Sequence, residues 1–252
     1  METAHMPTTA DRGSREIRAL LTLIGGLVAL ALVLGGAYDL LDLTARSTFT
    51  VQASYAGVRS LVVDSGNGDV HLTGAPAGSR LRILEHVTEG LTTPARETAS
   101  NGARTMQIRS HCAFILSEEC SVDYQISVPS GTTVRVSTGA GDIAVRTLTS
   151  RASLRLSSGA GDIDASAISA PEVNLSSGAG DIHAQLLHPA QQLEASSGAG
   201  DIVLTVPNVA YAVTTSSGVG NITDSSLSID PSSPRRINAS AGAGDVTIQA
   251  SR

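Results

Sequence analysis

The sequence contains no lysine and no tryptophan, and its 252 residues include only two cysteines, two phenylalanines and four tyrosines. Without lysine, the chain cannot use a P-loop lysine, a Schiff base or any other lysine-dependent catalytic step. Charged residues make up 16% of the chain and the formal net charge is −6, which fits neither a basic nucleic-acid-binding protein nor a disordered acidic chain. We therefore expect a folded protein with no nucleic-acid partner.

Charge is also missing from residues 19–38, a run of twenty residues that would span about 30 Å as a helix, the hydrocarbon thickness of a bilayer. The sequence predicts a transmembrane helix over residues 19–40. Arg12, Arg15 and Arg18 precede the run and only Arg46 follows it closely, so the positive-inside rule places the N-terminus in the cytoplasm. A cleaved signal peptide is the alternative, although the run exceeds a usual signal h-region of about 7–15 residues. Both interpretations export the rest of the chain, to the membrane surface in the first case and as a secreted protein in the second.

The two cysteines, Cys112 and Cys120, lie in the part expected outside the cytoplasm. An isolated pair in that compartment most often forms a disulfide, and closing so short a loop would stabilise the fold by about 2.5 kcal/mol. The pair has neither the C-x-x-C spacing of redox or zinc sites nor the position of a lipoprotein anchor. The sequence therefore predicts a local disulfide.

One six-residue phrase, Ser-Gly-Ala-Gly-Asp-Ile or a close variant, occurs seven times. Its first glycine stands at Gly66, Gly139, Gly159, Gly178, Gly198, Gly218 and Gly242. The intervals are 73, 20, 19, 20, 20 and 24 residues. Apolar and polar residues alternate on both sides of each phrase, as in Leu154 and Leu156 before one copy and Ile163 and Ala165 after it, which is the pattern of a β-strand.

These features predict an all-β fold, a parallel β-solenoid of coils of about twenty residues, each made of a strand, a Gly-rich corner, a second strand and a polar corner. One coil cannot bury a core alone, but coils stacked in register align their apolar residues and pair each strand with its successor. Roughly ten coils at about 4.8 Å each would form a rod some 45 Å long. Tight corners require positive φ or close backbone approach, so we assign a structural role to the corner glycines. They are Gly139, Gly141, Gly159, Gly161, Gly178, Gly180, Gly198, Gly200, Gly218, Gly220, Gly242 and Gly244.

The period is broken over residues 74–122, which include the cysteine pair. Residues 89–103 are polar, contain Gly and Pro, and are predicted to form a loop. Such an interruption can carry function or can be an irregular end cap. The predicted organisation is a cytoplasmic N-terminus (1–18), a transmembrane helix (19–40), a linker (41–48) and an extracytoplasmic β-solenoid (49–252).

Residues 124–143, Tyr-Gln-Ile-Ser-Val-Pro-Ser-Gly-Thr-Thr-Val-Arg-Val-Ser-Thr-Gly-Ala-Gly-Asp-Ile, are followed by successive Ser-Gly-Ala-Gly-Asp-Ile coils. This sequence resembles the bacterial putative-adhesin repeat family, a domain of unknown function, over about residues 49–250. The resemblance implies a β-solenoid-like extracytoplasmic domain, often with an N-terminal membrane anchor and with no established enzymatic activity. The family has no defined functional residues, so none is carried over.

The repeat also places an acidic residue at each corner: Asp142, Asp162, Asp181, Asp201 and Asp245, with Asn221 in the same column. In-register carboxylates near 5 Å apart would repel each other by about 0.9 kcal/mol per pair in water. A row of Ca²⁺ ions could offset this repulsion, but one acid per corner falls short of the six to eight oxygens that calcium prefers. We favour the alternative that each Asp accepts backbone N–H bonds of its own corner, and expect no cofactor.

Catalytic signatures are weak. His183 and His188 have no zinc-ligand spacing, and the serine pairs recur with the corner rather than in a G-x-S-x-G elbow. Acidic and basic residues in the irregular stretch could serve a polysaccharide-cleaving β-helix, but they are more simply a solvated surface. They are Glu118, Glu119, Asp123, Arg80, Arg82 and Arg109. We expect no enzyme.

The expected function is a non-catalytic, membrane-anchored, adhesin-like or envelope interaction module that binds an envelope polymer or protein. An accessory protein of cell-envelope stress signalling is the alternative, and an exported polysaccharide-acting enzyme is the third. The last strand, expected at residues 246–250, has no evident cap, so we expect either a fold-back over its edge or self-association.

Overall fold

The computed structural model describes residues 21–37, 47–89, 95–101, 104–111, 120–224 and 226–251. The chain divides into two compact units, Met1–Arg46 and Ser47–Arg252. In the first unit, residues 21–37 form a helix. No helix within the described ranges is long and apolar enough to cross a membrane, so the transmembrane prediction for residues 19–40 is not supported there. The remaining residues of the predicted segment, 19–20 and 38–40, lie outside the described residues.

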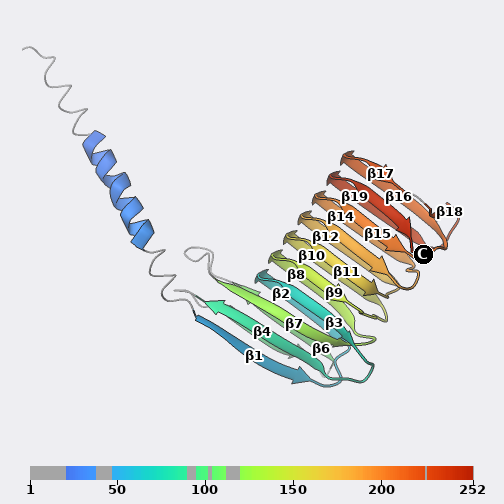
Figure 1. Cartoon of the computed structure of the whole chain (residues 1–252). Helices are drawn as coiled ribbons and strands as arrows, with labels where there is room; N and C mark the ends of the chain where they lie inside the picture. The colour runs from blue at the N-terminus through green and yellow to red at the C-terminus, as the bar shows by residue number, and fades with distance from the viewer. Residues whose placement is uncertain are drawn as a thin grey trace, which may run out of the picture. The chain divides into compact units, whose positions relative to one another are not determined.

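The second unit is mostly β-strand and forms two ten-stranded, parallel-rich sheets, consistent with a β-solenoid (Figure 1). The first half of its strands are β1 (Ser47–Tyr55), β2 (Ser60–Asn67), β3 (Val70–Ala75), β4 (Leu81–Glu89), β5 (Ala95–Asn101), β6 (Thr105–His111), β7 (Ser121–Pro129), β8 (Thr133–Ala140), β9 (Ile143–Arg146) and β10 (Ser153–Ala160). The others are β11 (Ile163–Ile168), β12 (Glu172–Ala179), β13 (Ile182–Leu186), β14 (Gln192–Ala199), β15 (Ile202–Val206), β16 (Ala210–Val219), β17 (Ile222–Thr223), β18 (Ser228–Ile229), β19 (Arg236–Ala243) and β20 (Val246–Ala250).

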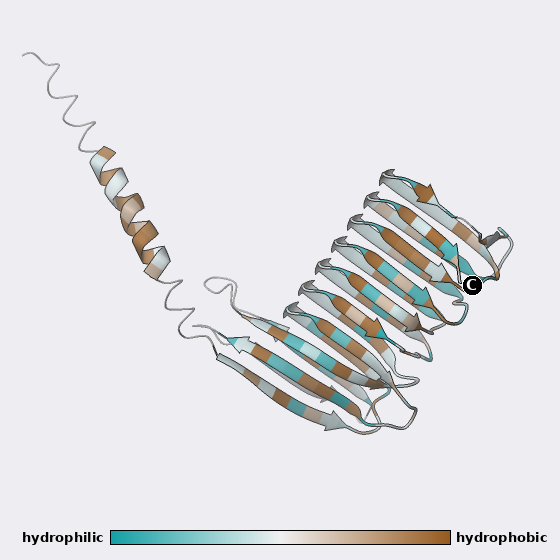
Figure 2. Cartoon of the chain, viewed as in Figure 1, coloured by the Kyte–Doolittle hydropathy of each residue, from teal (hydrophilic) through white to brown (hydrophobic). Residues whose placement is uncertain are grey.

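The core lies between the two sheets because each strand alternates buried apolar and outward polar residues. In β10, Leu154 and Leu156 are buried whereas Arg155 and Ser157 are exposed. The same alternation is visible as brown and teal segments along the strands in Figure 2. Parallel pairing in register carries each apolar residue onto its counterpart in the next coil, as Leu154 onto Val173. The predicted columns of apolar residues are confirmed.

We call the sheet that contains β1 sheet A and the sheet that contains β5 sheet B. Sheet A has the order β1-β4-β7-β3-β9-β11-β13-β15-β20-β17. Sheet B has the order β18-β16-β19-β14-β12-β10-β8-β2-β6-β5. From β8 to β15 each coil stacks on its successor, as predicted.

At the N-terminal end of the solenoid, stacking order and chain order differ. The coil β2–β3 lies between the coils β6–β7 and β8–β9, because β2 pairs with both β6 and β8 and β3 pairs with both β7 and β9. The interval of 73 residues between Gly66 and Gly139 is therefore not an interruption of the stack: these two corners are direct neighbours. The intervening chain forms another coil on the far side of β2–β3, and the prediction that each coil stacks on its sequence successor is wrong here.

The C-terminal end shows a second insertion. Strand β20 pairs with β15 on one edge and with β17 on the other, while β19 lies between β14 and β16. The sequence predicted either a fold-back over the last strand or self-association. Strand β17 covers part of that edge, because Ile222 and Thr223 pair with Val246 and Thr247, and self-association stays a prediction. At this end the outermost strands β17 and β18 have two residues each, so each covers only part of its neighbour. Strand β18 pairs with Ala210 and Tyr211 of β16, and no described strand pairs with the outer edge of residues 212–219, which is open to a further strand.

The stretch that breaks the period contains regular strands that reverse direction instead of coiling. Strand β4 pairs antiparallel with β1 and β7, and β5 pairs antiparallel with β6. The prediction of a loop over residues 89–103 is wrong for β5, Ala95–Asn101. The sequence of this strand, Ala-Arg-Glu-Thr-Ala-Ser-Asn, lacks the apolar alternation from which a strand is recognised.

Polar groups line the core at this end of the solenoid. Glu85 is 8% exposed and points inward from β4, where its Oε2 accepts a hydrogen bond of 3.2 Å from Nη1 of Arg96. The guanidinium of Arg96 also lies 5.1 Å from the ring centroid of Phe49 on β1, a cation–π contact. Arg96 thus connects β5, the edge strand of one sheet, to β4 and to the edge strand β1 of the other.

Candidate interaction surfaces

The repeated Asp forms a continuous ladder along the Gly-rich corners. In each step Oδ1 of one Asp accepts the backbone N–H of the corresponding residue in the neighbouring coil, at 2.7–2.9 Å. In stacking order the ladder runs through Asp123, Asp69, Asp142, Asp162, Asp181, Asp201, Asp245 and Asn221. The prediction that each Asp bonds within its own corner is wrong, because the acceptor and donor belong to different coils. These charge-assisted bonds offset the repulsion between stacked carboxylates.

The ladder of Asp side chains ends at Asn221, whose side chain is an uncharged amide. Asn221 donates its backbone N–H to Asp245 at 2.7 Å, and its Nδ2 lies 3.4 Å from the same Oδ1. Among the strands that the structure describes, no coil follows β16–β17 to supply a further N–H, so a carboxylate here would have no such partner. An uncharged residue is the less costly choice at this position.

The corner glycines are required by the closeness of the stack. A Cβ on Gly159 would lie 2.5 Å from the carbonyl oxygen of Gly139, and one on Gly180 would lie 2.2 Å from that of Gly161. Gly180 also has a φ of +147°, a backbone conformation that other residues rarely adopt. The structural role expected for these glycines follows from this geometry.

Of each serine pair in the phrase, one hydroxyl is internal and the other points outward. Ser158, Ser177 and Ser197 are buried and donate to glycine carbonyls of the neighbouring coil at 2.9–3.0 Å. Ala241 occupies this column between Ser197 and Ser217, is 3% exposed, and has no hydroxyl to donate. The inward serines therefore hold coils together, as the recurrence with the corner predicted.

The calcium hypothesis for the Asp column stays a prediction. Each carboxylate of the column from Asp142 to Asp245 already accepts a backbone N–H through Oδ1. Within the described parts of the chain, no group of three or more His, Cys, Asp or Glu could hold a metal ion.

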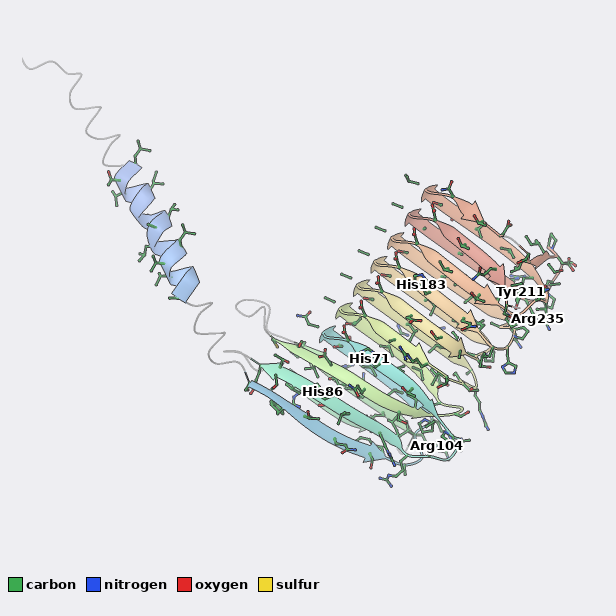
Figure 3. The ribbon with its side chains drawn as sticks, viewed as in Figure 1. His71, His86, Arg104, His183, Tyr211 and Arg235 are labelled. Atoms are coloured by element: carbon green, nitrogen blue, oxygen red, sulfur yellow. The ribbon has the colours of Figure 1, made fainter. Side chains whose placement is uncertain are left out.

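The other residues singled out from the sequence are dispersed. His71, His86 and His183 lie on the outer face of sheet A (Figure 3). Asp123 and Arg82 are on sheet A but Arg109 is on sheet B, so these three do not form one cluster. Glu118 and Glu119 lie outside the described residues.

Cys120 is buried and disulfide-bonded. Cys112 lies outside the described residues, so its pairing with Cys120 stays a prediction. Cys120 directly precedes β7, the strand that joins the antiparallel strands of sheet A to the coils.

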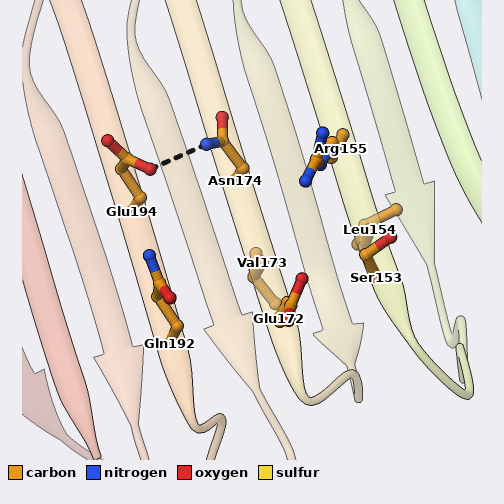
Figure 4. Close-up of a pocket in the computed structure, with 8 residues that line it drawn as sticks. All are labelled: Ser153, Leu154, Arg155, Glu172, Val173, Asn174, Gln192 and Glu194. Carbon is orange, nitrogen blue, oxygen red and sulfur yellow. Dashed lines mark hydrogen bonds between the residues drawn. The ribbon is translucent and has the colours of Figure 1, made fainter.

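The outer face of sheet B carries a compact polar surface. The residues Ser153, Glu172 and Gln192 pair in register across β10, β12 and β14, and Arg155, Asn174 and Glu194 form a second row beside them. We call these six residues the sheet B shelf. They surround a shallow depression of about 140 Å³ in which Nδ2 of Asn174 donates to Oε2 of Glu194 at 2.8 Å (Figure 4). A third row, of outward serines, runs beside the shelf: Ser137, Ser157, Ser176, Ser196, Ser240 and Ser216.

The shelf was not predicted, although the sequence contains a signal for it. Intervals of 19 and 20 residues place Arg155, Asn174 and Glu194 side by side once the coils are taken to stack in register. The spacing of the repeat does not show which of the stacked rows of side chains lie around a depression on the outer face.

A second depression lies on the outer face of sheet A, over β1, β4, β7 and β3. Its volume is about 540 Å³. It is lined by Gln52, His71, Thr73, Arg82, Ile83, Leu84, Gln125, Ile126 and Ser127. Beside it, His86 lies 3.2 Å from Oγ1 of Thr50 through Nδ1 and 3.4 Å from Nε2 of Gln125 through its own Nε2.

Comparison with known proteins identifies a family and several solved structures with a similar fold. The family model described as Toastrack DUF4097 matches residues 42–252. Among solved structures, a putative cell adhesion protein from Clostridium sporogenes is 14% identical, with 81% of this chain and 100% of that chain covered and a TM-score of 0.50. At this identity the likeness concerns the fold.

Two other solved structures are similar over comparable lengths. A putative adhesin from Bacteroides fragilis is 16% identical, covering 81% of this chain and 97% of its own, with a TM-score of 0.43. A protein from Parabacteroides distasonis described as a putative lipid binding protein is 12% identical, covering 82% and 97%, with a TM-score of 0.36. No curated protein matches the sequence.

Proposed function

The chain belongs to the Toastrack DUF4097 family, and from this premise we propose that it is a non-catalytic interaction module of the cell envelope that binds polar partners through the sheet B shelf. The observation that carries the proposal is the in-register array of six polar side chains on a rigid sheet. The description of the Clostridium sporogenes protein as a putative cell adhesion protein agrees with an adhesin-like role.

The chemistry of the shelf suits hydroxyl and amide groups. Arg155 and Gln192 supply N–H donors, while Glu172 and Glu194 supply carboxylate acceptors. Among the described contacts within the shelf, the bond between Asn174 and Glu194 is the one side-chain hydrogen bond, so most of these groups are available to a partner. Their strands are fixed by pairing on both sides, so little ordering is required on binding.

The shape of the shelf favours an extended partner over a compact one. A depression of about 140 Å³ is smaller than the 300–1,000 Å³ typical of small-molecule pockets. A polymer with a repeating polar unit, by contrast, could follow the rows across successive strands about 4.8 Å apart. We therefore propose an envelope polysaccharide as the partner.

Site-specific photo-crosslinking in intact cells tests this proposal. A photoreactive residue replaces Gln192 on the shelf or, as the matched control, Gln185, an exposed glutamine on the outer face of sheet A. We expect polysaccharide adducts from position 192 and none from position 185. The double substitution R155A/N174A should remove the adducts from position 192.

The possible results separate the candidate functions. Adducts at position 192 with one membrane protein would favour the accessory role in envelope stress signalling over the adhesin-like role. Equal yields at positions 192 and 185, or adducts at 185 alone, would refute the shelf. Degradation of polysaccharide by the purified chain would refute the non-catalytic assignment.

The proposal includes the location expected from the sequence, with residues 1–18 cytoplasmic, 19–40 in the membrane and the β-unit outside. The uncharged run at residues 19–38 supports it, although no described helix is long and apolar enough to span a membrane. Alkaline carbonate extraction with protease treatment of intact cells tests it. Retention in the membrane with a protease-accessible β-unit is expected, whereas release of the full-length chain by carbonate would contradict the anchor.

A further inference from the structure

The sheet A depression contains a basic row that the proposed function does not use. Arg82 on β4 pairs with Ser127 on β7, Ser127 pairs with Thr73 on β3, and Thr73 pairs with Arg146 on β9. All four lie on the outer face of the sheet, with Arg82, Thr73 and Arg146 exposed and Ser127 half-buried. Two guanidinium groups thus flank two hydroxyls. We call these four residues the Arg–Ser–Thr–Arg row.

The dimensions of the row allow both arginines to reach one ligand. Three strand-to-strand steps of about 4.8 Å separate the backbones of Arg82 and Arg146 by about 14 Å. Two long side chains extending toward each other can span this distance above Ser127 and Thr73, and those hydroxyls lie between them. Arg82, Ser127 and Thr73 line the depression, and Arg146 lies beside it on β9.

The charges of the row have no counterion in the described chain. Neither Arg82 nor Arg146 makes a hydrogen bond or ion pair with any described residue. The lining of the depression contains no Asp or Glu, although the whole chain has a net charge of −6. Two carboxylates on the same face, Asp123 and Asp164, accept the N–H of Asp69 and the hydroxyl of Ser166, at 2.9 and 2.8 Å. An unpaired arginine in the lining of the depression, with a second unpaired arginine beside it on the next strand, is an arrangement that can bind an anion.

The arrangement of donors distinguishes among anions. A planar carboxylate is satisfied by one guanidinium fork. Two forks from opposite sides with two hydroxyls beneath them suit an anion with several oxygens pointing in different directions, which a phosphate ester provides. The amides of Gln52 and Gln125, elsewhere in the same lining, can bond the hydroxyls of an attached sugar or polyol.

We propose that the Arg–Ser–Thr–Arg row is a binding site for the phosphate ester of a sugar or polyol. The site is on the sheet opposite the sheet B shelf and is independent of it. The depression has a volume of about 540 Å³, within the range of small-molecule sites.

Isothermal titration of the full-length protein with glucose 1-phosphate tests the site, with glucose, glucuronate and inorganic phosphate as comparison ligands. We expect saturable binding of glucose 1-phosphate, at least tenfold weaker binding of glucuronate, and none of glucose. R82A and R146A should each weaken binding about tenfold or more, the usual effect of losing a hydrogen bond to a charged group. R151A is the matched control, because it removes an equal charge from an exposed arginine outside the depression.

Thermal unfolding of the same variants shows whether they remain folded, since Arg82 and Arg146 are exposed and make no described internal bond. Equal loss of binding in R82A and R151A would overturn the proposal, because it would indicate nonspecific charge attraction. So would binding of glucuronate as tight as that of glucose 1-phosphate. Binding to phosphatidylglycerol vesicles without binding of the free sugar phosphate would also overturn it, in favour of a lipid surface. The crosslinks from position 192 should be unaffected by R82A, so failure of this site leaves the proposed function standing.

Discussion

The closeness of stacking at the Gly-rich corner can be measured with three Gly-to-Ala substitutions. Gly78 has a φ of +81° with open space around it. Gly159 has no positive φ, but its added Cβ would lie 2.5 Å from the carbonyl oxygen of Gly139. Gly180 combines the two problems, with a φ of +147° and a Cβ 2.2 Å from the carbonyl oxygen of Gly161. The three variants therefore separate backbone strain from collision between coils.

The expected losses of unfolding free energy follow from these geometries. Placing alanine at positive φ costs about 1–2 kcal/mol, which is the whole cost expected for G78A. Overpacking usually costs about 1–3 kcal/mol, and G159A should reach about 3 because the obstacle is backbone that cannot rotate away. G180A should lose about 5 kcal/mol, the approximate sum of both effects. Such a loss would remove much of the about 5–15 kcal/mol typical of a folded domain.

Equilibrium urea denaturation of the full-length protein, followed by circular dichroism of the β-signal, measures the three losses. The order G78A, G159A, G180A is the essential result, because it does not depend on the absolute scale. If G180A were no more destabilising than G78A, the coils would not approach each other as closely at this corner as the structure shows, and the explanation of the glycine repeat would be wrong.

Further predictions concern the hydroxyl column, two buried tyrosines and the Asp ladder. A241S should gain about 1 kcal/mol in urea denaturation by supplying the missing hydroxyl, and S197A should lose about as much; a loss in both would show that the column does not bind the coils. Burial raises the pKa of Tyr124 to about 12 from an ordinary value near 10, so its contribution to stability is complete below pH 10 and should fall by about 2 kcal/mol as the pH rises to 12. Y124F should flatten this alkaline decline of the melting temperature, and an unchanged decline would exclude Tyr124 as its cause. The Tyr211 hydroxyl is the one buried side-chain polar atom of the described residues without a hydrogen-bond partner, so Y211F should be neutral or stabilising; a loss above 1 kcal/mol by denaturation would reveal a bond not accounted for. EDTA and added Ca²⁺ should leave the melting temperature unchanged because backbone N–H groups already bind the carboxylates, and a rise of several degrees with Ca²⁺ would favour the metal column.

The stacking of the interior coils could be predicted from the sequence, because the strand pattern and the spacing of the repeat indicate the same neighbouring strands. Equal intervals and alternating apolar residues between Gly139 and Gly198 specify both the strands and their neighbours, and the structure has the predicted columns. The order of the end coils could not be read this way. Intervals of 73 and 24 residues show that the period changes, but the same strands could stack at the end of the rod or between two earlier coils.

The candidate sites depend on that order. Arg82 and Arg146 are far apart in the sequence and belong to an antiparallel strand and a coil strand, so no motif contains both. Glu85 and Arg96 fall within the stretch that breaks the period, where neither spacing nor a motif indicates that they pair. In contrast, the residues of the sheet B shelf lie within the regular repeat and follow from its period and an assumed register.

The β-coils, their corner glycines and the buried columns are predictable from the sequence, because period-two alternation and positive φ are local requirements that the chain must satisfy wherever a coil stacks. The insertion of β2–β3 and β19–β20 between other coils becomes visible only in the folded chain, as do the bonds that the Asp side chains make across coils rather than within them. The edge of a parallel strand can pair with any other strand whose register matches, so the local pattern does not specify the neighbour. Which coil provides that partner depends on the return path of the chain and on burial of the whole stack, and neither is encoded in a single coil.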